Sequence, residues 1–436
     1  MAAVALGAGV AHSSAAAAGV TIALAIGTAL VWTGPFGIAQ ASLAALPWLI
    51  VFDALIPAQL RTLVTVFAVI VLLVALSPLT YRRPAILGIA AVFGAVVIAH
   101  AIYATNSEQF IQAAKYAVFP AMSLAVLSGR ATELLPRARM VLLASGVAAL
   151  LVHLAIVTAG LGEVGTYYGV GEKLGYAEAI PHEMALLAVI VAAAGLVTAQ
   201  RVPAKVMFFA VGAVPAVLTG VRSALLAIVL ILLVYAVQTA FSPRTLAVLA
   251  GIVLMAFASG AAQTVTERFN AEAEFSSVSS VGSGRGAIYE VALDGWRASG
   301  IKGWVFGTGL RSVALFSLER LGVELVGHSD LVEVGVQLGL VGLVAWLLIW
   351  AMLFTGHLRV VVLLPVAAYA AVNGSIEYVA PLTVGLALAA ACVQPSPRAA
   401  GDLGGGGEMS PRRRGEPAAR GATGLAANRE RQSGRV

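Results

Sequence analysis

The sequence predicts an all-α polytopic membrane protein with about 12 transmembrane helices (roughly 11 to 13) and one large extracytoplasmic loop that contains short helices. Three observations lead to this fold class. Of the 436 residues, 60% are hydrophobic and only 11% are charged, whereas roughly a quarter of the residues in a soluble domain are charged. Apolar runs of about 20 residues recur along nearly the whole chain. These runs do not alternate polar and apolar residues, as the strands of a membrane β-barrel do.

The predicted helices follow from the apolar runs taken in order. A helix rises about 1.5 Å per residue, so each run is long enough, or nearly so, to cross a hydrocarbon layer of about 30 Å. The runs lie at 15–33, 36–56, 62–79, 85–104, 111–128, 140–161, 183–200, 205–220, 223–240, 245–263, 331–354, 359–374 and 379–393. The first three are separated only by weak breaks, and we therefore expect about 12 spans from these runs.

The runs divide the chain into four parts. Residues 1–263 form the N-terminal transmembrane helices, residues 264–329 the extracytoplasmic loop, and residues 330–393 the C-terminal transmembrane helices. Residues 394–436 contain eight arginines, four acidic residues and a run of four glycines, and we expect a disordered basic tail. Because this tail carries most of the formal net charge of +6, the basic balance indicates orientation in the membrane and not a nucleic-acid partner.

Basic residues in short loops predict which side of the membrane each loop faces. They occur at every second loop, which the positive-inside rule assigns to the cytoplasm together with the C-terminal tail. These residues are Arg82, Arg83, Arg130, Arg137, Arg139, Arg201, Lys205, Arg244 and Arg359. Arg61 is the exception to the alternation. The intervening loops, including the long polar stretch, are expected to face outward and to carry most of the polar chemistry.

Arg222 lies in a turn between two predicted spans, in the sequence Leu218–Ala224 (LTGVRSA). One interpretation is a clamp for an anion at the membrane surface, to which Ser223 and the N-terminus of the following helix would add hydrogen-bond donors and a favourable dipole. The alternative is a structural arginine whose guanidinium reaches the interface. The turn alone does not choose between these interpretations.

A second arginine, Arg285, lies among glycines and serines just before an amphipathic helix expected at 287–298. A guanidinium binds phosphate through two parallel hydrogen bonds, and glycines let the backbone approach closely. The alternative is a flexible linker that carries a solvated arginine. Tyr289 and Trp296 share a stripe with Arg285, and Trp296 and Trp304 suit the headgroup zone. We therefore expect this segment to rest on the outer membrane surface as a lid.

His328 lies where the long loop re-enters the membrane, in the sequence GHSDLVE. Histidine side chains titrate near pH 6.5, so this residue can accept a proton at neutral pH, and Asp330 or Glu333 can orient its ring. The structural alternative is a helix start at which Ser329 or Asp330 forms the N-cap. No second histidine or carboxylate stands at metal-ligand spacing, and we assign no metal.

Several other polar residues are weaker candidates. Ionisable residues within apolar runs are costly and often functional, and here they are Asp53, Lys115 and His153. Asp53 and Lys115 lie close enough to span ends to reach the interface. An acidic outer loop holds residues able to bind sugars, with an ordinary polar loop as the alternative: Tyr167, Tyr168, Glu172 and His182. The single cysteine, Cys392, excludes a disulfide within the chain.

Three segments, taken together, resemble the O-antigen ligase / O-antigen polymerase superfamily of bacterial polytopic membrane proteins. Leu218–Leu226 (LTGVRSALL) is similar to that superfamily's Thr-x-Ser-Arg-Gly-Ala turn. Arg285–Leu293, followed by Trp304–Leu310 (WVFGTGL), resembles the arginine, helix and Phe-Gly-x-Gly turn of its large loop. Gly327–Gly342 (GHSDLVEVGVQLGLVG) resembles its His-Asn-Asp-Tyr-Leu re-entry helix. The resemblance covers residues 205–354.

The resemblance implies a membrane glycosyltransferase of the bacterial plasma (inner) membrane. Such an enzyme moves a glycan from a polyprenyl diphosphate carrier, such as undecaprenyl diphosphate, to an acceptor hydroxyl on the outer face. It implies that His328 is the general base and that Arg222 and Arg285 bind the diphosphate. The substrate-binding residues expected around them are Ser223, Tyr289, Asp330 and Glu333. The expected partners are the lipid-linked donor, a glycan, lipid or cell-wall acceptor, and membrane lipids, without a metal or other cofactor and without nucleic acid.

Other functions stay open at this stage. A polysaccharide polymerase of the same superfamily differs from a ligase only in its acceptor. A transporter or flippase of lipid-linked envelope glycans predicts paired discontinuous helices and charges near mid-membrane, whereas the sequence has no apparent internal repeat and its polar features gather on one side. A non-catalytic scaffold in an envelope assembly is a further alternative. A transfer assay set against uptake into proteoliposomes separates the enzyme from the transporter.

Overall fold

The computed structural model describes residues 34–52, 56–158, 164–166, 172–174, 181–219, 221–240, 242–258, 285–322, 324–325, 327–356 and 359–393. Some predicted features lie outside these residues, namely the apolar run at 15–33, Asp53, Tyr167, Tyr168, the first part of the long loop and the tail at 394–436. Arg222 and Arg285 are described as parts of helices, and their side chains lie outside the description.

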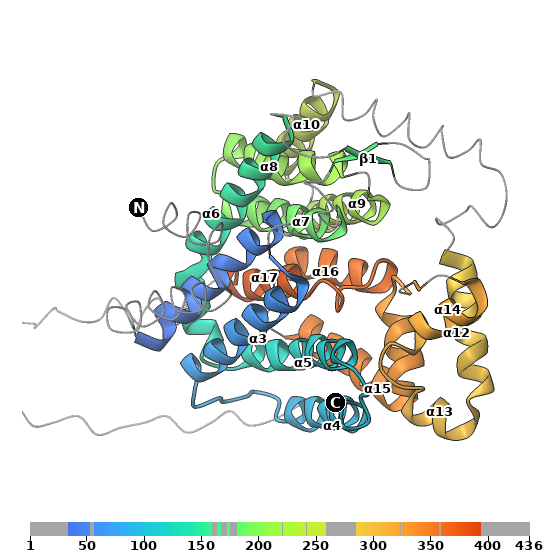
Figure 1. Cartoon of the computed structure of the whole chain (residues 1–436). Coiled ribbons are helices and arrows are strands. Elements are labelled where there is room, and N and C mark those ends of the chain that lie inside the picture. The colour runs from blue at the N-terminus through green and yellow to red at the C-terminus, as the bar shows by residue number, and fades with distance from the viewer. Residues whose placement is uncertain are drawn as a thin grey trace, which may run out of the picture. The chain divides into compact units, whose positions relative to one another are not determined.

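Each apolar run within the described residues forms a helix (Figure 1). Such segments become helical because a helix satisfies every backbone N–H and C=O internally, which a lipid environment requires. The helices are Gly34–Val51, α3 (Ala58–Ala75), α4 (Ala85–Ile102), α5 (Ser107–Leu127), α6 (Ala131–Thr158), α7 (Pro181–Thr198), α8 (Val202–Leu218), α9 (Arg222–Gln238), α10 (Pro243–Ala258), α15 (Asp330–Thr355), α16 (Val360–Val372) and α17 (Val379–Ala391). Most ends lie within a few residues of the predicted ends, but α6 begins at Ala131 and not near residue 140.

Six helices are long and apolar enough to cross a membrane, judged by length and composition: Gly34–Val51, α4, α5, α6, α7 and α15. Six others contain shorter apolar stretches, of 10–17 residues: α3, α8, α9, α10, α16 and α17. The predicted class of polytopic helical membrane protein is therefore supported.

One short β-ribbon departs from the all-α prediction. β1 (Val164–Thr166) and β2 (Glu172–Leu174) pair antiparallel, with Gly165 opposite Lys173. The ribbon belongs to the polar connection between α6 and α7, which lacks the apolar run that makes its neighbours helical. It does not alter the helical architecture.

Helices α7 and α17 form the centre of the bundle. Every residue of α17 is buried, and so is α7 from His182 to Leu196. Both helices are rich in alanine, and small residues let helices approach closely in a membrane. A Cβ added at Gly212 of α8 would meet Ala188 and Ala192 of α7, so this contact also needs a glycine. Figure 1 shows α16 and α17 between the group α7–α9 and the group α3–α5.

Three short helices precede α15: α12 (Arg285–Ala298), α13 (Gly300–Phe306) and α14 (Ser312–Leu321). The predicted amphipathic helix is confirmed as α12. Its residue Ile288 packs in one apolar cluster with Val313 of α14 and Val336 of α15. Trp296 and Trp304 stack with ring centroids 5.0 Å apart. These contacts hold the three loop helices together against the first part of α15 (Figure 1).

Helix α15 is interrupted at Gly339, whose φ of 69° and ψ of −173° are not helical. The interruption frees carbonyl groups of the preceding turn, and the glycine turn after α13 satisfies them. The Thr308 N–H donates to Val336 O (2.9 Å), and the Gly309 N–H donates to Gln337 O (3.2 Å). The break in α15 is thus the place where the loop helices attach, because backbone freed inside a membrane helix must find new partners.

Helices α5 and α15 lie side by side through aromatic contacts. Phe119 of α5 lies 6.3 and 5.2 Å, between ring centroids, from Trp346 and Trp350 of α15. The first turns of both helices lie near the loop helices, and their last turns lie near the loop that holds Arg82 and Arg83. A helix of 21 residues such as α5 separates these two ends by roughly 30 Å. The arginine end is the one that the sequence predicts to face the cytoplasm.

Arg61, the exception in the charge alternation, forms an ion pair within the bundle. Its Nη1 lies 3.0 Å from Glu183 Oε2, and the two side chains are only 12% and 10% exposed. An arginine paired with a carboxylate inside the protein does not report the side of its loop, since the positive-inside rule concerns solvated charges. The exception therefore has a local physical cause.

We expect Gly339→Ala to destabilise the protein by about 2 kcal/mol or more. Alanine would keep a positive φ, at a cost of roughly 1–2 kcal/mol, and its Cβ would collide with the backbone of Val305, Phe306 and Gly307. Thermal unfolding of the detergent-solubilised protein measures the effect. Gly88→Ala is the matched control, because a Cβ at Gly88 has open space around it. Equal unfolding temperatures for the two variants would contradict this account of the break.

Candidate active site

His328 occupies a left-handed turn directly before α15. Its φ is 51°, a conformation that residues other than glycine adopt rarely and that tends to persist at functional sites. Ser329 takes the N-cap position of α15, as expected, but its Oγ donates to Ala371 O (2.8 Å) and not to the helix backbone. The turn is therefore held by contacts to α16, and it presents a half-buried imidazole.

A second histidine, His182 at the start of α7, lies next to His328. The two ring centroids are 5.8 Å apart, with 46° between the ring planes. The ring of Tyr378 stacks on His182 at 6.0 Å and 24°. The sequence suggested His182 only as one residue of a sugar-binding outer loop, whereas the structure places it beside the candidate base.

Asn373 connects His182 to the start of α9. Its Nδ2 lies 2.9 Å from His182 Nδ1 and donates to Ser223 Oγ at 2.7 Å. Because an amide nitrogen only donates, Nδ1 of a neutral His182 is the acceptor, and the ring proton sits on Nε2. Arg222 precedes Ser223 and is the first residue of α9, so the backbone of the predicted anion clamp begins at this cluster.

The second predicted arginine lies on a helix that is fixed to α15. Arg285 is the first residue of α12, and Tyr289 follows one turn later, half-buried. Between them, Ile288 packs in the cluster that contains Val336 of α15. The backbone of Arg285 is thereby tied to the helix that starts directly after His328.

Asp330 ties the start of α15 to the turn between α16 and α17. It is buried, and its carboxylate accepts hydrogen bonds from Ser375 N–H (3.0 Å), Ser375 Oγ (2.7 Å) and Ile376 N–H (3.1 Å). These contacts fix the turn, which carries Asn373 at one end and Glu377 at the other. Asp330 was expected to orient His328 or to bind substrate, and in the structure it holds this turn.

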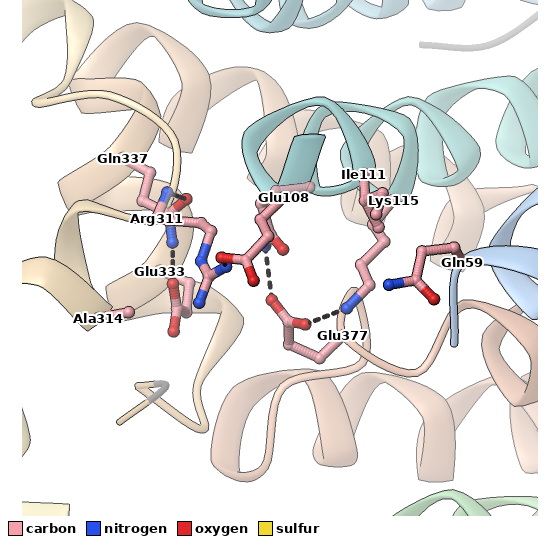
Figure 2. A pocket seen from close by; sticks show the side chains of 10 residues that line it. Gln59, Glu108, Ile111, Lys115, Arg311, Ala314, Glu333, Gln337 and Glu377 are labelled. Atoms are coloured by element: carbon pink, nitrogen blue, oxygen red, sulfur yellow. Dashed lines mark hydrogen bonds and ion pairs between the residues drawn. The ribbon is translucent and has the colours of Figure 1, made fainter. Parts of the chain in front are cut away.

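A polar pocket of about 220 Å³ lies at the first turns of α5 and α15. Figure 2 shows its carboxylates and cations facing one another across the opening. Three carboxylates, two cations and three amides line it: Glu108, Glu333, Glu377, Lys115, Arg311, Gln59, Gln112 and Gln337. Within the described ranges, no group of three or more His, Cys, Asp or Glu side chains could hold a metal ion.

An ion pair forms one wall of this pocket. Lys115 Nζ lies 2.6 Å from Glu377 Oε2, and Gln112 Nε2 donates to Glu377 Oε1 at 2.5 Å (Figure 2). Burial alone would raise the pKa of Glu377, but Lys115 and the hydrogen bonds from Lys115 and Gln112 outweigh it, so this pKa lies below its ordinary value. Glu377 is therefore a carboxylate at neutral pH. The sequence suggested that Lys115 reaches the interface, whereas its partner is this glutamate.

Arg311 forms the opposite wall. Its φ of 65° is again left-handed, and its backbone N–H donates to Gln337 Oε1 (2.8 Å). Its guanidinium pairs with Glu108 of α5 and with Glu324 in the loop before α15. This arginine thus connects α5, α15 and the loop helices around the pocket mouth.

Glu333 links the pocket to the candidate base. Its carboxylate accepts hydrogen bonds from the Gly327 N–H and from Gln337 Nε2. Gly327 directly precedes His328, so a residue that lines the pocket also holds the turn of the histidine. Glu333 therefore connects the pocket to the His328 turn through the backbone of Gly327.

A comparison with known families agrees with the resemblance seen in the sequence. Residues 206–347 match the family described as O-antigen ligase. The match supports the O-antigen ligase superfamily over this region. The matched O-antigen ligase region runs from α8 into α15 and contains Arg222, Arg285 and His328, and the predicted resemblance is confirmed over it. No curated protein sequence matches the chain.

Sequence reasoning missed three residues of the candidate site: Arg311, Asn373 and Glu377. The last two belong to a short polar interruption, Asn373–Glu377, between two apolar runs. Such an interruption on the outward side was a signal that could have found them. Arg311 gave no such signal, because it lies in a loop with many other charged residues.

We expect Lys115→Met to destabilise the protein by about 1–3 kcal/mol, between the values for exposed and buried ion pairs, because it leaves the half-buried Glu377 carboxylate without its cation. The double variant Lys115→Met/Glu377→Gln should recover much of this loss in thermal unfolding. Arg297→Met is the matched control. Its ion pair with Asp294 is exposed, at 67% and 39%, so the loss should be below about 1 kcal/mol. A double variant no more stable than Lys115→Met would refute the stabilising role of this half-buried ion pair.

Proposed function

We propose that this protein transfers a glycan from a polyprenyl diphosphate carrier to an acceptor hydroxyl on the outer face of the membrane. One observation carries the proposal. Side chains from α7, α9, the α16–α17 turn and the start of α15 gather at His328, through His182, Ser223, Asn373 and Asp330. This gathering lies within or directly against the region matched by the O-antigen ligase family.

The proposed step needs one base and one anion site. The acceptor oxygen bonds to the anomeric carbon while the bond from that carbon to the diphosphate oxygen breaks, and the polyprenyl diphosphate leaves with the electron pair. His328 takes the hydroxyl proton, and Arg222 and Arg285 stabilise the charge that develops on the diphosphate. A direct displacement of this kind inverts the anomeric centre. The diphosphate is already a good leaving group, so we assign no metal.

Two further residues have proposed positioning roles. Asn373 holds His182 in the form that carries its proton on Nε2, next to the ring of His328. Asp330 fixes the turn that presents Asn373. Neither residue needs to touch the reacting atoms for its loss to displace the base.

We place the acceptor side of the reaction in the pocket of Figure 2. Carboxylates and amides such as Glu333 and Gln59 offer the acceptors and donors that sugar hydroxyls need. At about 220 Å³ the pocket is smaller than the roughly 300–1,000 Å³ of drug-sized ligand sites, which suits a single sugar ring. Gln59 has no hydrogen-bond partner among the described residues, so its amide is available to a ligand.

The proposed membrane placement follows from the two ends of α5 and α15. If the six shorter apolar helices also cross, the described residues contain about 12 spans. The arginine end then faces the cytoplasm of a bacterial inner membrane, with the C-terminus on the same side, and the His328 end faces outward. A lipid-linked donor would reach such a site from the outer leaflet.

We expect His328→Gln to lower the transfer rate by about 10²–10⁴-fold, because glutamine cannot take the acceptor proton at neutral pH. The assay uses protein reconstituted with lipid-linked donor and measures the glycosylated acceptor. His100→Gln is the matched control, since His100 contacts Phe306 O at the end of α13 and lies outside the cluster. Near-normal transfer by His328→Gln would refute the role of His328 as the general base.

Donor-side and acceptor-side variants should affect different substrates. Arg222→Lys and Arg285→Lys should each weaken use of the donor by about 10²-fold or more, because lysine lacks the bidentate fork. Arg297→Lys, also on α12 and exposed, is the control. Gln59→Leu should raise the KM for the acceptor and leave the KM for the donor unchanged. Unimpaired donor use by both lysine variants would refute the clamp.

A ligase glycosylates a lipid or wall anchor in this assay, and a polymerase extends a second lipid-linked glycan.

A further inference from the structure

A second pocket, also of about 220 Å³, lies at the other end of α5 and α15, roughly 30 Å from the candidate active site. It lies between the loop from α3 to α4, the loop from α5 to α6 and the last turn of α15. Its polar lining comes from Tyr81, Arg82, Arg83, Thr132 and Thr355. None of the residues that line it is acidic. It therefore has a chemistry of its own, distinct from the mixed charges of the first pocket.

Contacts between distant segments hold this pocket in shape. The Gly129 N–H donates to Thr80 O (2.7 Å), and Tyr81 and Ser128 form an antiparallel bridge. A Cβ at Gly129 would lie only 2.8 Å from Thr80 Oγ1, so the two loops meet with no room for a side chain. Arg83 Nη1 donates to Thr355 Oγ1 (2.6 Å) and joins the α3–α4 loop to the end of α15.

The polar side chains of the pocket offer more hydrogen-bond donors than acceptors. Arg82 has no hydrogen bond or ion pair among the described residues, and Arg83 donates one N–H to Thr355. The hydroxyl of Tyr81 is buried and has no hydrogen-bond partner in the described part of the chain. Burial also raises the pKa of Tyr81, so this hydroxyl stays protonated. Two adjacent guanidinium groups without a carboxylate suit an anion with several acceptor oxygens, which is the chemistry of a phosphate.

The rest of the lining of the pocket is apolar. Its other walls include Ile86, Leu127 and Met352. Leu87 follows Ile86 in α4, and Leu348 lies one turn before Met352 in α15; both leucines are exposed, at 46% and 45%, as side chains that face lipid are. Helices α4 and α15 pack against each other, and both contribute residues to the pocket. A free phosphate would leave the apolar walls bare, whereas a phospholipid covers both parts.

We propose that this pocket binds the headgroup of an anionic glycerophospholipid from the leaflet on the arginine side of the membrane. The phosphate lies between Arg82 and Arg83, and the acyl chains run along α4 and α15. Basic pockets between transmembrane helices on the cytoplasmic side recognise anionic headgroups in this way. The site does not depend on the proposed transfer reaction, because it uses none of its residues. Its occupation would join the α3–α4 loop to the ends of α5 and α15.

The test is a titration of the full-length, detergent-solubilised protein with lipid, followed by thermal unfolding and by native mass spectrometry. The arms are phosphatidylglycerol, zwitterionic phosphatidylcholine and inorganic phosphate. Phosphatidylglycerol should raise the unfolding temperature and stay bound, and the other two should not. Arg82→Gln/Arg83→Gln should weaken phosphatidylglycerol binding by about tenfold to thirtyfold. Arg297→Gln/Arg320→Gln removes the same charge from exposed positions on α12 and α14 and should bind as the unaltered protein does.

Three results would overturn the proposal. Equal stabilisation by phosphatidylcholine would show that the headgroup charge is not recognised. Stabilisation by inorganic phosphate that phosphatidylglycerol does not increase would assign the pocket to a free anion. Equal weakening in the Arg297/Arg320 control would indicate a general charge effect. If the Arg82/Arg83 double variant does not fold, the same lipid titration is carried out with the single variant Arg82→Gln. This substitution breaks no hydrogen bond or ion pair among the described residues.

Discussion

The arrangement of the site depends on one buried carboxylate. Asp330 lies at the first turn of α15 and is satisfied by Ser375 and Ile376, which belong to a turn 45 positions further along the chain. A buried carboxyl group is stable only while its oxygens keep hydrogen-bond partners. The turn therefore cannot move away from α15 without leaving these buried oxygens unsatisfied. This constraint fixes the two halves of the site relative to each other.

The turn held by Asp330 serves both halves because its polar residues point to different partners. Asn373, at its start, bonds with His182 and Ser223 and so belongs to the histidine cluster. Glu377, at its end, bonds with Lys115 and Gln112 and so belongs to the pocket. One short polar segment between two apolar helices thus positions residues of both the histidine cluster and the pocket. The cluster and the pocket are consequently coupled through backbone and not through a flexible side chain.

Much of the fold followed from the sequence because lipid imposes a simple rule. An apolar run must be helical, and breaks between runs fix the helix ends within a few residues, as in α4, α7 and α15. The site was predicted only in part. His328 and the start of α9 were found because they stand at span ends next to polar residues. The pairing of Lys115 with Glu377 was not found, because the two residues are 262 positions apart and periodicity carries no information on partners.

The break at Gly339 explains how the loop helices can contribute to a site formed by membrane helices. Before the break, the segment from Asp330 to Leu338 carries Glu333 and Gln337, and its carbonyls accept hydrogen bonds from the turn after α13. After the break, the helix packs on α5 through its tryptophans. Gln337 bonds with the backbone of Arg311 on one side and with Glu333 on the other. The first part of α15 therefore belongs structurally with the loop, and the helix that follows it belongs with the bundle. A histidine placed at the start of such a segment is positioned by both, which suits the proposed transfer between a lipid-borne donor and an external acceptor.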